Sequence, residues 1–437
     1  MPKINILSKI LNHNGDGAGF FRYFTNTVWL FIEQFLRMMS GLLVGVWVAR
    51  HLGPEQFGTF SYLITIAAIC GGVAKLGMDG IIVNDLINKP ELRDDYLGTA
   101  FWIRIISALG IIFLIAPIIW LTTKDIKTNI FVLITITGII FQAFEVLELF
   151  FLSQVLAKTI SICKIIQLVI SSLLKIYCVL IDADLMYFVI LFGFDALVFA
   201  FSIFIAYRIK YAVSFLSRFK FSIAKSLLKD SWPLLLSTVV VLIYQRLDQI
   251  LIKNMLDDRS LGVYTAALKF TDSFYFIPMI LTNSLATALI NAKKNNVKLY
   301  RARLKRIYFL VLLISISIAV TIYFLSNILI QTFYGNEFKE AGGLLSMHAI
   351  TLVLVGMGIV VTRWYIIENR PHIVFYNTLA GAMVSLIANF VLIPIYGLKG
   401  AVIASVLSHF TAAYAMNFVW QETRKDFLVL NKLSWSN

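Results

Sequence analysis

The sequence has few charged residues and very few cysteines. Only 14% of its 437 residues are Asp, Glu, Lys or Arg, against about 25% in ordinary soluble domains. The three cysteines, Cys70, Cys163 and Cys178, lie in or beside apolar runs, which excludes a disulfide framework and a zinc-ligand spacing. A soluble protein of this length would need a far larger charged surface, so the soluble classes are excluded.

Motifs of ATP use and of hydrolysis are also missing. The sequence contains no GxxxxGK[ST] phosphate loop and no GxSxG elbow, and its five histidines lack metal-ligand spacing. The loops that we assign to the outer face are too short to seat a sugar chain beside a catalytic base. We therefore expect a protein that is not an enzyme and that holds no metal or organic cofactor.

Long apolar segments take up most of the chain, which is 59% hydrophobic with a mean hydropathy of +0.83. A helix that crosses a bilayer needs about 20 apolar residues, and twelve segments meet this requirement. They run approximately over 24–49, 57–84, 96–121, 128–156, 165–181, 185–207, 231–255, 260–291, 307–326, 341–367, 372–394 and 400–421. The sequence predicts an all-α polytopic membrane protein with two six-helix lobes.

The predicted lobes are residues 1–207 and 231–437, joined by a basic linker over 208–230. Lys and Arg exceed Asp and Glu by 38 to 24, a net charge of +14. Most of this surplus falls in the termini, in the linker and in the segment after the eighth span. Because basic residues accumulate in cytoplasmic loops, we expect both termini and the linker in the cytoplasm. The same rule explains the basic runs without a nucleic-acid partner.

The two halves resemble each other in sequence. At a constant offset of 204 residues, four positions match: Leu52 with Leu256, Gly58 with Gly262, Phe60 with Tyr264 and Ser61 with Thr265. The same offset brings the Gly71-Gly72 pair close to Pro278, so the second span of each half has a helix breaker at similar depth. Repeated halves with interrupted helices are typical of transporters. We expect Gly71, Gly72 and Pro278 to be bends that let these helices gate.

Ionisable residues inside the apolar spans are the candidate site residues. A charge at mid-bilayer costs at least about 2.5–3.5 kcal/mol, so it usually faces a partner or a cavity. Several stand at helical spacing on the first, second and eighth spans: Glu33 with Arg37, Lys75 with Asp79, and Lys269 with Asp272. Pairing within each helix is one interpretation. For the first, second, seventh and eighth spans together we favour a hydrated central cavity.

The two signs of charge predict two roles. Cations in a low-dielectric cavity bind phosphate or pyrophosphate, and Arg does so bidentately; the candidates are Arg37, Arg246, Arg104, Arg363 and Lys269. A carboxylate among cations can carry H+ or Na+ as the coupling ion; the candidates are Asp79, Asp248, Asp272 and Glu33. We expect Glu145 and Glu148 of the fourth span to be structural.

Two segments resemble motifs of a known family. Residues 49–60, ARHLGPEQFGTF, look like the "ARxLGPExFG" turn after the first helix. Residues 389–401, NFVLIPIYGLKGA, look like the "N-x-x-LIP-x-YG-x-x-GA" junction of the last two helices. The whole chain thus resembles the Wzx-type O-antigen and polysaccharide flippases of the multidrug/oligosaccharidyl-lipid/polysaccharide (MOP) exporter superfamily.

The resemblance implies two lobes that form a V around a cationic cavity in the bacterial inner membrane. The implied cargo is an oligosaccharide on undecaprenyl pyrophosphate, such as an O-antigen repeat unit, turned from the inner to the outer leaflet by alternating access. Ion-coupled antiport is the implied drive, and a polymerase and a chain-length regulator are implied partners besides membrane lipids. A multidrug or cation antiporter of the same superfamily, or an O-antigen polymerase or glycosyltransferase, stays open as an alternative.

Overall fold

The computed structural model describes residues 17–122, 125–211, 215–420, 424 and 427, and in these ranges the chain folds into helices and short connections without a strand. The ends of the two predicted lobes (residues 1–16 and 428–437), the end of the predicted last span at residue 421 and part of the predicted linker (residues 212–214) lie outside the described residues. The predicted all-α fold class is confirmed.

Eight α-helical and 3-10 segments follow one another before α8 and complete the N-terminal half with it. They are α2 (Gly17–Ala74), α3 (Asp79–Asn88), η1 (Pro90–Leu92), α4 (Arg93–Thr122), α5 (Ile126–Thr137), η2 (Gly138–Glu145), α6 (Val146–Ser153), α7 (Ala157–Leu180) and α8 (Leu185–Lys210). The short η3 (Phe215–Ser217) then leads into α9. The predicted linker is therefore partly helical, since α8 extends into it and α9 begins in it.

The C-terminal half begins with the long α9 and ends with a short 3-10 turn. Its elements are α9 (Phe221–Met255), α10 (Asp258–Phe274), α11 (Phe276–Asn295), α12 (Val297–Phe333), η4 (Asn336–Phe338), α13 (Glu340–His348), α14 (Ile350–Ile367), α15 (Pro371–Tyr396), α16 (Leu398–Ala413) and η5 (Ala415–Phe418).

Ten segments of the described chain are long and apolar enough to cross a membrane. The first of them, Thr25–Asn88, holds two of the twelve predicted spans, 24–49 and 57–84. These two spans meet at Gly53, whose φ of 68° turns the chain back inside α2. The predicted span 260–291 is divided between α10 and α11. These two differences account for ten segments where the sequence predicts twelve spans.

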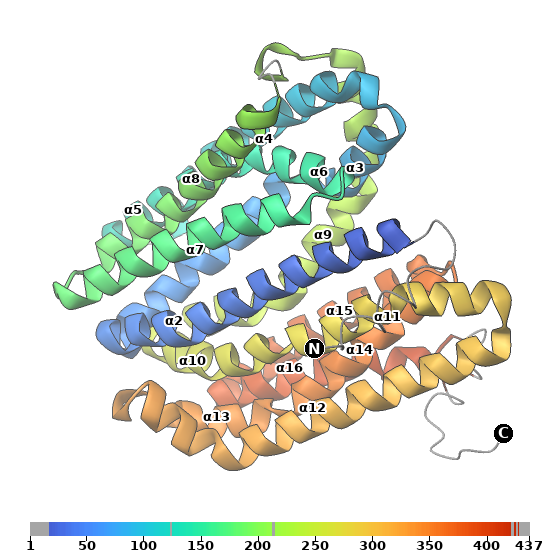
Figure 1. The fold of residues 1–437 in the computed structure, drawn as a ribbon. Helices are drawn as coiled ribbons and strands as arrows, with labels where there is room; N and C mark the ends of the chain where they lie inside the picture. Colours follow the sequence, from blue (N-terminus) through green and yellow to red (C-terminus); the bar gives the residue numbers. More distant parts are fainter. Residues whose placement is uncertain (1–16, 123–124, 212–214, 421–423, 425–426, 428–437) are drawn as a thin grey trace, which may run out of the picture.

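The two halves share one hydrophobic core at one end of the molecule and have separate cores at the other. The shared core combines residues of the N-terminal half, such as Leu63 and Phe188, with residues of the C-terminal half, such as Tyr264 and Leu345. A second cluster lies in the N-terminal half together with the start of α9, and a third lies in the C-terminal half. In Figure 1 the halves accordingly meet on the left and diverge toward the right.

We call the joined end the closed end and the other the basic end. The closed end carries the turn at Gly53 and the connections before α8, α10, η4 and α16, whereas the basic end carries the connections before α4, α9, α12 and α15. The basic end is named for the cations in and beside these connections, which include Lys89, Arg218, Lys220, Lys293 and Arg370. The predicted grouping of basic residues on one side therefore matches the side on which the halves separate.

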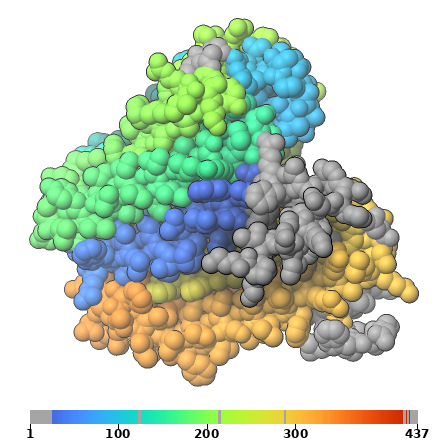
Figure 2. All heavy atoms as spheres, in the orientation of Figure 1, coloured from blue at the N-terminus to red at the C-terminus, as the bar shows by residue number. Residues whose placement is uncertain are grey.

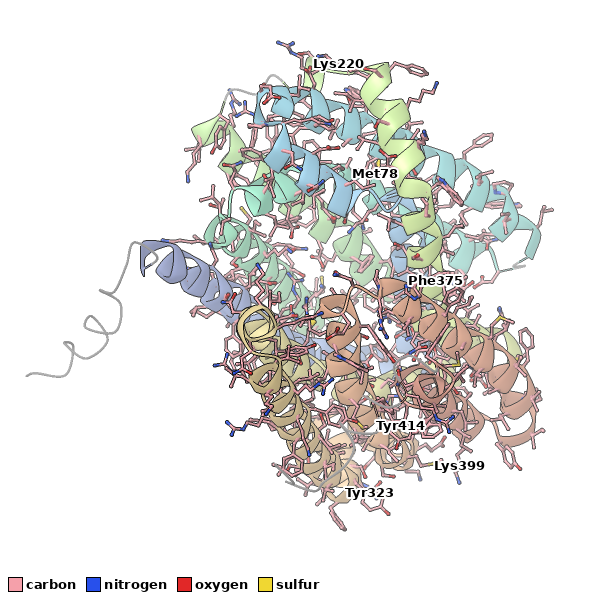
Figure 3. All side chains as sticks on the ribbon, turned by 90° about the vertical axis from the view of Figure 1, so that its right-hand side faces the viewer. Met78, Lys220, Tyr323, Phe375, Lys399 and Tyr414 are labelled. Atoms are coloured by element: carbon pink, nitrogen blue, oxygen red, sulfur yellow. The ribbon has the colours of Figure 1, made fainter. Side chains whose placement is uncertain are left out.

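Helices α2 and α9 tie the halves together. The side chains of Ile223 and Leu227, near the start of α9, belong to the core of the N-terminal half, while the rest of α9 packs on α15 and α10. Figure 3 shows α9 passing from Lys220, at the top of the N-terminal half, down toward Phe375 on α15. On the face shown in Figure 2, α2 (blue) lies between the green helices of the N-terminal half and the orange helices of the C-terminal half.

The second span of each half is interrupted, but the breaks lie at other residues than the sequence predicts. Gly71 and Gly72 lie inside the helical part of α2, and the break follows at Lys75–Met78, where Leu76 and Gly77 have positive φ of 54° and 67°. The two glycines instead make room for neighbours, because a Cβ would lie 2.7 Å from Gln142 Oε1 at Gly71 and 2.2 Å from Leu242 Cδ1 at Gly72. The prediction that Gly71-Gly72 is the bend is therefore wrong.

In the other half the break falls at Tyr275, three residues before Pro278. Pro278 has no N–H to donate to the carbonyl of Phe274, where α10 ends. Whether either break moves during transport stays a prediction.

Candidate anion-binding site between the two halves

Five cations within or beside the apolar helices of the N-terminal half are paired with carboxylates. Five ion pairs join them: Arg37–Glu33 (2.7 Å), Lys75–Glu145 (2.7 Å), Arg104–Asp79 (2.5 Å), Lys164–Glu148 (2.6 Å) and Lys175–Asp195 (2.8 Å). Each pair neutralises charge that would be costly to leave alone in a low-dielectric region. Glu145 and Glu148 thus have the pairing role that their position in the sequence predicts.

Glu33 and Arg37 form the pair within one helix that their spacing predicts. The Nε of Arg37 donates to Glu33 Oε1 at 2.7 Å, and the side chain of Glu33 is buried while that of Arg37 is 40% exposed. Arg37 therefore has its charge satisfied before any cargo arrives. This lowers its standing as the first candidate for phosphate binding.

Lys75 and Asp79 do not pair, because α2 ends at Ala74 and α3 begins only at Asp79, so the two residues do not share a helix. The positive φ of Leu76 and Gly77 turns the chain, so that Lys75 reaches Glu145 of η2 and Asp79 reaches Arg104 of α4. For Lys75 and Asp79, the interpretation of pairing within one helix is therefore wrong.

Arg104 lies inside the N-terminal half. Its side chain is only 3% exposed, whereas that of Asp79 is 47% exposed. The Nε and Nη1 atoms of Arg104 have no hydrogen-bond partner among the described residues. The ion pair of Arg104 with Asp79 holds α4 against the start of α3. Because the guanidinium is buried, a bulky ligand cannot reach it.

Asp248 of α9 is buried where the two halves join. Its Oδ2 accepts from the hydroxyl of Tyr264 at 2.6 Å, and its Oδ1 accepts from the backbone N–H of Gln249 at 2.8 Å. The next side chain, Gln249, crosses to the other half and accepts from the hydroxyl of Thr65 at 2.5 Å. Of the candidate carboxylates, Asp248 is the one whose hydrogen bonds lie beside a contact between the halves.

Three ionisable side chains on α9 and α10 are left without such partners. Arg246, Lys269 and Asp272 make no side-chain hydrogen bond or salt bridge with any residue that the structure describes. They interact electrostatically with one another, since Asp272 is within reach of both Arg246 and Lys269. Arg246 and Lys269 are partly exposed and Asp272 is exposed. The group carries two cations against one carboxylate.

Counted from the closed end, this group lies at the depth expected for the middle of a membrane. Arg246 lies nine residues before the end of α9 and Lys269 lies eleven residues after the start of α10, both counted from the closed end. At 1.5 Å per residue each is about 15 Å from the closed end, which is half of a hydrocarbon core of about 30 Å. Cations kept unpaired and accessible at this depth suit an anionic ligand.

The surroundings of Lys269 come from the opposite half. A Cβ at Gly45 of α2 would lie 2.9 Å from Lys269 Nζ, so the glycine leaves the space in which the ammonium lies against this helix. The ring of Phe57, also on α2, is centred 6.0 Å from Nζ. Lys175 of α7 is close enough to repel Lys269 electrostatically, although it is itself paired with Asp195.

Arg363 of α14 is the remaining candidate cation. It donates to the amide oxygen of Asn283 on α11 and forms no salt bridge in the described part of the chain. Both residues belong to the C-terminal half and lie nearer to its basic end. The structure therefore brings Arg246, Lys269 and Asp272 together, adds Asp248 beside them, and leaves Arg37, Arg104, Asp79 and Glu33 in pairs elsewhere.

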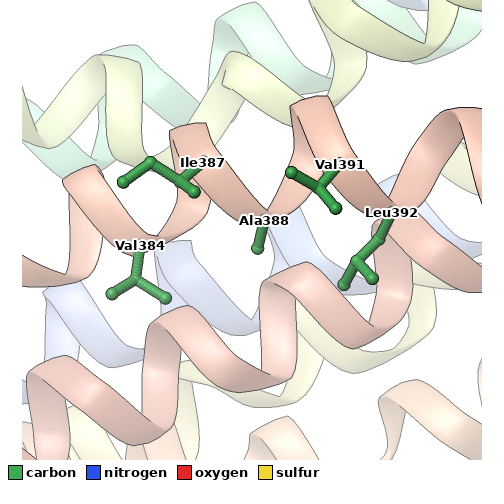
Figure 4. Close-up of a pocket in the computed structure, with 5 residues that line it drawn as sticks. All are labelled: Val384, Ile387, Ala388, Val391 and Leu392. Atoms are coloured by element: carbon green, nitrogen blue, oxygen red, sulfur yellow. The ribbon is translucent and has the colours of Figure 1, made fainter.

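An apolar groove of about 310 Å³ lies apart from this group, on α15. Figure 4 shows its lining, which consists of Val384, Ile387, Ala388, Val391 and Leu392. With no polar group in the lining it matches hydrocarbon chains and offers nothing to an anion. In the described residues, no three His, Cys, Asp or Glu side chains gather as metal ligands.

Sequence reasoning missed the polar contacts that hold the halves together. Thr65, Gln249 and Tyr264 are neutral, and a neutral polar residue in an apolar helix has no signal of its own. The signal nearest to them is the internal repeat, because Tyr264 is one of its matched positions and Thr65 lies just beyond it.

Comparisons with known proteins agree on one family and one fold. The family described as "Polysaccharide biosynthesis protein" matches residues 47–343. The capsular polysaccharide biosynthesis protein CapF of Staphylococcus aureus is 20% identical over 414 residues, which cover 91% of this chain and 98% of CapF.

Two kinds of solved structure share the fold. An inward-facing multidrug resistance MATE family transporter of the MOP superfamily matches with a TM-score of 0.70 and 16% identity, over 92% of this chain and 96% of that one. The lipid II flippase MurJ in an inward closed conformation matches with a TM-score of 0.69 and 18% identity, over 93% and 90%.

An outward-facing MATE transporter matches less well, with a TM-score of 0.64 and 15% identity over 94% of this chain and 96% of that one. The predicted MATE/MOP-like architecture of a multi-pass membrane protein is confirmed.

Proposed function

The chain belongs to the family of polysaccharide biosynthesis proteins, and we propose that it is a flippase for an oligosaccharide carried on undecaprenyl pyrophosphate. The cargo would pass from the inner to the outer leaflet of the bacterial inner membrane, with both termini in the cytoplasm. The basic connections support this orientation, because Lys and Arg mark the cytoplasmic side. The structural similarity to the lipid II flippase MurJ supports the class of cargo.

The observation that carries the proposal is the unpaired state of Arg246 and Lys269. Five cations within the helices of the N-terminal half, among them Arg37 and Arg104, form salt bridges with carboxylates. Arg246 and Lys269 form none with a residue that the structure describes, and they share the one nearby carboxylate of Asp272. A pyrophosphate supplies the missing negative charge and accepts charge-assisted hydrogen bonds from both. The sugars would lie in the space toward the basic end, and the isoprenoid chain would stay among the lipids.

The arrangement of the cores supports alternating access. The halves are joined at the closed end and have separate cores at the basic end. With the basic end in the cytoplasm, this would be the state that receives cargo from that side. Delivery to the outer leaflet requires the shared core at the closed end to part and the basic ends to come together. We propose that a coupling ion, H+ or Na+, drives this cycle, with Asp248 and Asp272 as its carriers ahead of the paired Asp79 and Glu33.

The test is transport by the purified chain in proteoliposomes. An undecaprenyl-pyrophosphate oligosaccharide is placed in one leaflet, and its appearance in the other is measured with a lectin or glycosidase that cannot cross the membrane. We expect translocation that depends on the chain and is lost in the Arg246→Gln/Lys269→Gln double variant. Wild-type chain that moves no lipid-linked oligosaccharide under any ion gradient would contradict the proposal.

The cellular test separates the alternatives. In a strain without the gene, lipid-linked units should accumulate on the cytoplasmic face. Units that reach the periplasmic face but stay unpolymerised would indicate a polymerase. Export of cationic drugs with normal surface polysaccharide would indicate a multidrug or cation antiporter.

A further inference from the structure

Phe57 of α2 inserts its ring into an aromatic pocket of the C-terminal half at the closed end. The ring is 3% exposed, and its centroid lies 6.1 Å from that of Phe338 and 6.5 Å from that of Tyr334. Tyr334 in turn packs edge-on against Phe270 of α10 at 6.0 Å. These rings belong to the core that the two halves share, so the closed end cannot part without pulling Phe57 out of its pocket.

The ammonium of Lys269 lies over the same ring. Its Nζ is 6.0 Å from the Phe57 centroid, at the limit of a cation–π contact. Gly45 leaves the space that the ammonium occupies against α2. Lys269 makes no hydrogen bond or salt bridge with a residue that the structure describes, so its contacts with charge or ring are the attraction of Asp272 and the face of Phe57.

Lys269 therefore belongs to two structures at once. Through Arg246 and Asp272 it is part of the candidate anion site. Through Phe57 it contacts the seal between the halves, by which we mean the Phe57 ring in its aromatic pocket. No other residue of the candidate site has a contact of this kind in the described chain. Arg246 supplies charge to the site without contacting the aromatic pocket.

We propose that Lys269 couples the binding of a pyrophosphate to the opening of the closed end, an inference that rests on the proposed function. A phosphate oxygen accepts charge-assisted hydrogen bonds from the ammonium, which are stronger than a contact with an aromatic face. When the ammonium turns toward the anion, it loses its contact with the Phe57 ring. The anion thus binds more tightly to the state in which the seal has lost this contact, and such a difference in affinity is what shifts a conformational equilibrium.

The experiment measures the distance between the halves at the closed end. Spin labels are placed on Ile181→Cys, before α8, and on Lys399→Cys, at the start of α16, both exposed positions. The three native cysteines are buried and are first replaced by alanine. The full-length chain in nanodiscs is titrated with farnesyl pyrophosphate, and binding is followed by calorimetry in parallel with the distance distribution.

We expect the wild-type chain to give a short distance that lengthens as farnesyl pyrophosphate binds. Lys269→Gln and Phe57→Leu should show the longer distance before the ligand is added and little change afterwards. Arg246→Gln should start short and lengthen fully, with an affinity lower by about tenfold or more because one charge-assisted contact is lost. Lys293→Gln, whose lysine pairs with Glu368 at the basic end, is the matched control and should behave as the wild type.

Three results would overturn the inference in distinguishable ways. A wild-type chain that binds farnesyl pyrophosphate without a change in distance removes the coupling and leaves the proposed function standing. A Lys269→Gln or Phe57→Leu chain that starts short and lengthens with ligand like the wild type removes the role of their contact. A wild-type chain that does not bind farnesyl pyrophosphate overturns the proposed function and the inference together.

Discussion

Gly58 of α2 and Gly262 of α10 cross each other in contact where the two halves join. A Cβ at Gly58 would lie 1.7 Å from the carbonyl oxygen of Asp258, and a Cβ at Gly262 would lie 1.9 Å from the carbonyl oxygen of Pro54. Asp258 and Gly262 stand 204 residues after Pro54 and Gly58, so the crossing has the symmetry of the internal repeat. The matching residues of the two halves therefore contact each other at this crossing. Both glycines are needed because the two backbones touch.

The first prediction concerns this crossing. Gly58→Ala or Gly262→Ala should destabilise the closed end by about 1–3 kcal/mol, because a methyl group has no space between the two backbones. The measurement is thermal unfolding of the purified chain in detergent. Gly110→Ala in α4 is the control, since no atom lies within 4 Å of its added Cβ; it should be neutral or stabilising. Equal unfolding temperatures for Gly58→Ala and Gly110→Ala would contradict the crossing.

The second prediction ranks the arginines. Arg246→Gln should lower the affinity for a pyrophosphate headgroup by about tenfold or more, because an unpaired cation loses a charge-assisted hydrogen bond. Arg37→Gln should change it far less, since Arg37 already pairs with Glu33 at 2.7 Å. Calorimetry with farnesyl pyrophosphate measures both, and recovery of surface polysaccharide in a deletion strain is the second readout. A larger loss for Arg37→Gln would reverse the ranking.

The third prediction concerns Asp79, whose partner Arg104 is buried. Asp79→Asn should destabilise the chain by about 1–3 kcal/mol, because it leaves the guanidinium without a carboxylate. The double variant Asp79→Asn/Arg104→Gln should recover part of this loss, since the buried charge is then absent. The more exposed pair Lys89–Asp85 is the control, and Asp85→Asn should cost less than about 1 kcal/mol. If Asp79→Asn unfolds at the wild-type temperature, the pair is not structural.

The fourth prediction tests the polar contact between the halves. Thr65→Val should cost about 1–3 kcal/mol, because it leaves the buried Oε1 of Gln249 without its donor. Thr59→Val removes a hydroxyl that bonds only to the carbonyl of Glu55 in its own helix, and it should change stability by less than about 0.5 kcal/mol. Thermal unfolding of both variants decides the matter, with equal effects counting against a contribution from the contact.

Much of the fold could be predicted because its cause is local in the sequence. The apolar segments, their approximate limits and the placing of basic residues at one end all follow from hydropathy and charge. Interruptions inside the segments were harder. Gly71 and Gly72 look like breakers, yet they stay helical because they serve packing against Gln142 and Leu242, while the break depends on positive φ at Leu76 and Gly77.

The candidate site was predictable as a set of residues but not as an arrangement. Burial cost indicates that charges in apolar helices have partners, and the spacing of Glu33 and Arg37 correctly names one pair. The same spacing fails for Lys75 and Asp79, since it assumes a continuous helix. Partners such as Glu145 and Lys175 come from other helices, and no spacing rule reaches them.

The sequence by itself determined that the chain spans a membrane many times, which end is basic, and that its halves are related, since each depends on residue type along the chain. Tertiary structure alone decided which charges cancel. Arg37, Lys75, Arg104, Lys164 and Lys175 meet carboxylates, whereas Arg246 and Lys269 do not. The physical reason is that pairing needs atoms within a few ångströms, and only the packing of separate helices sets those distances.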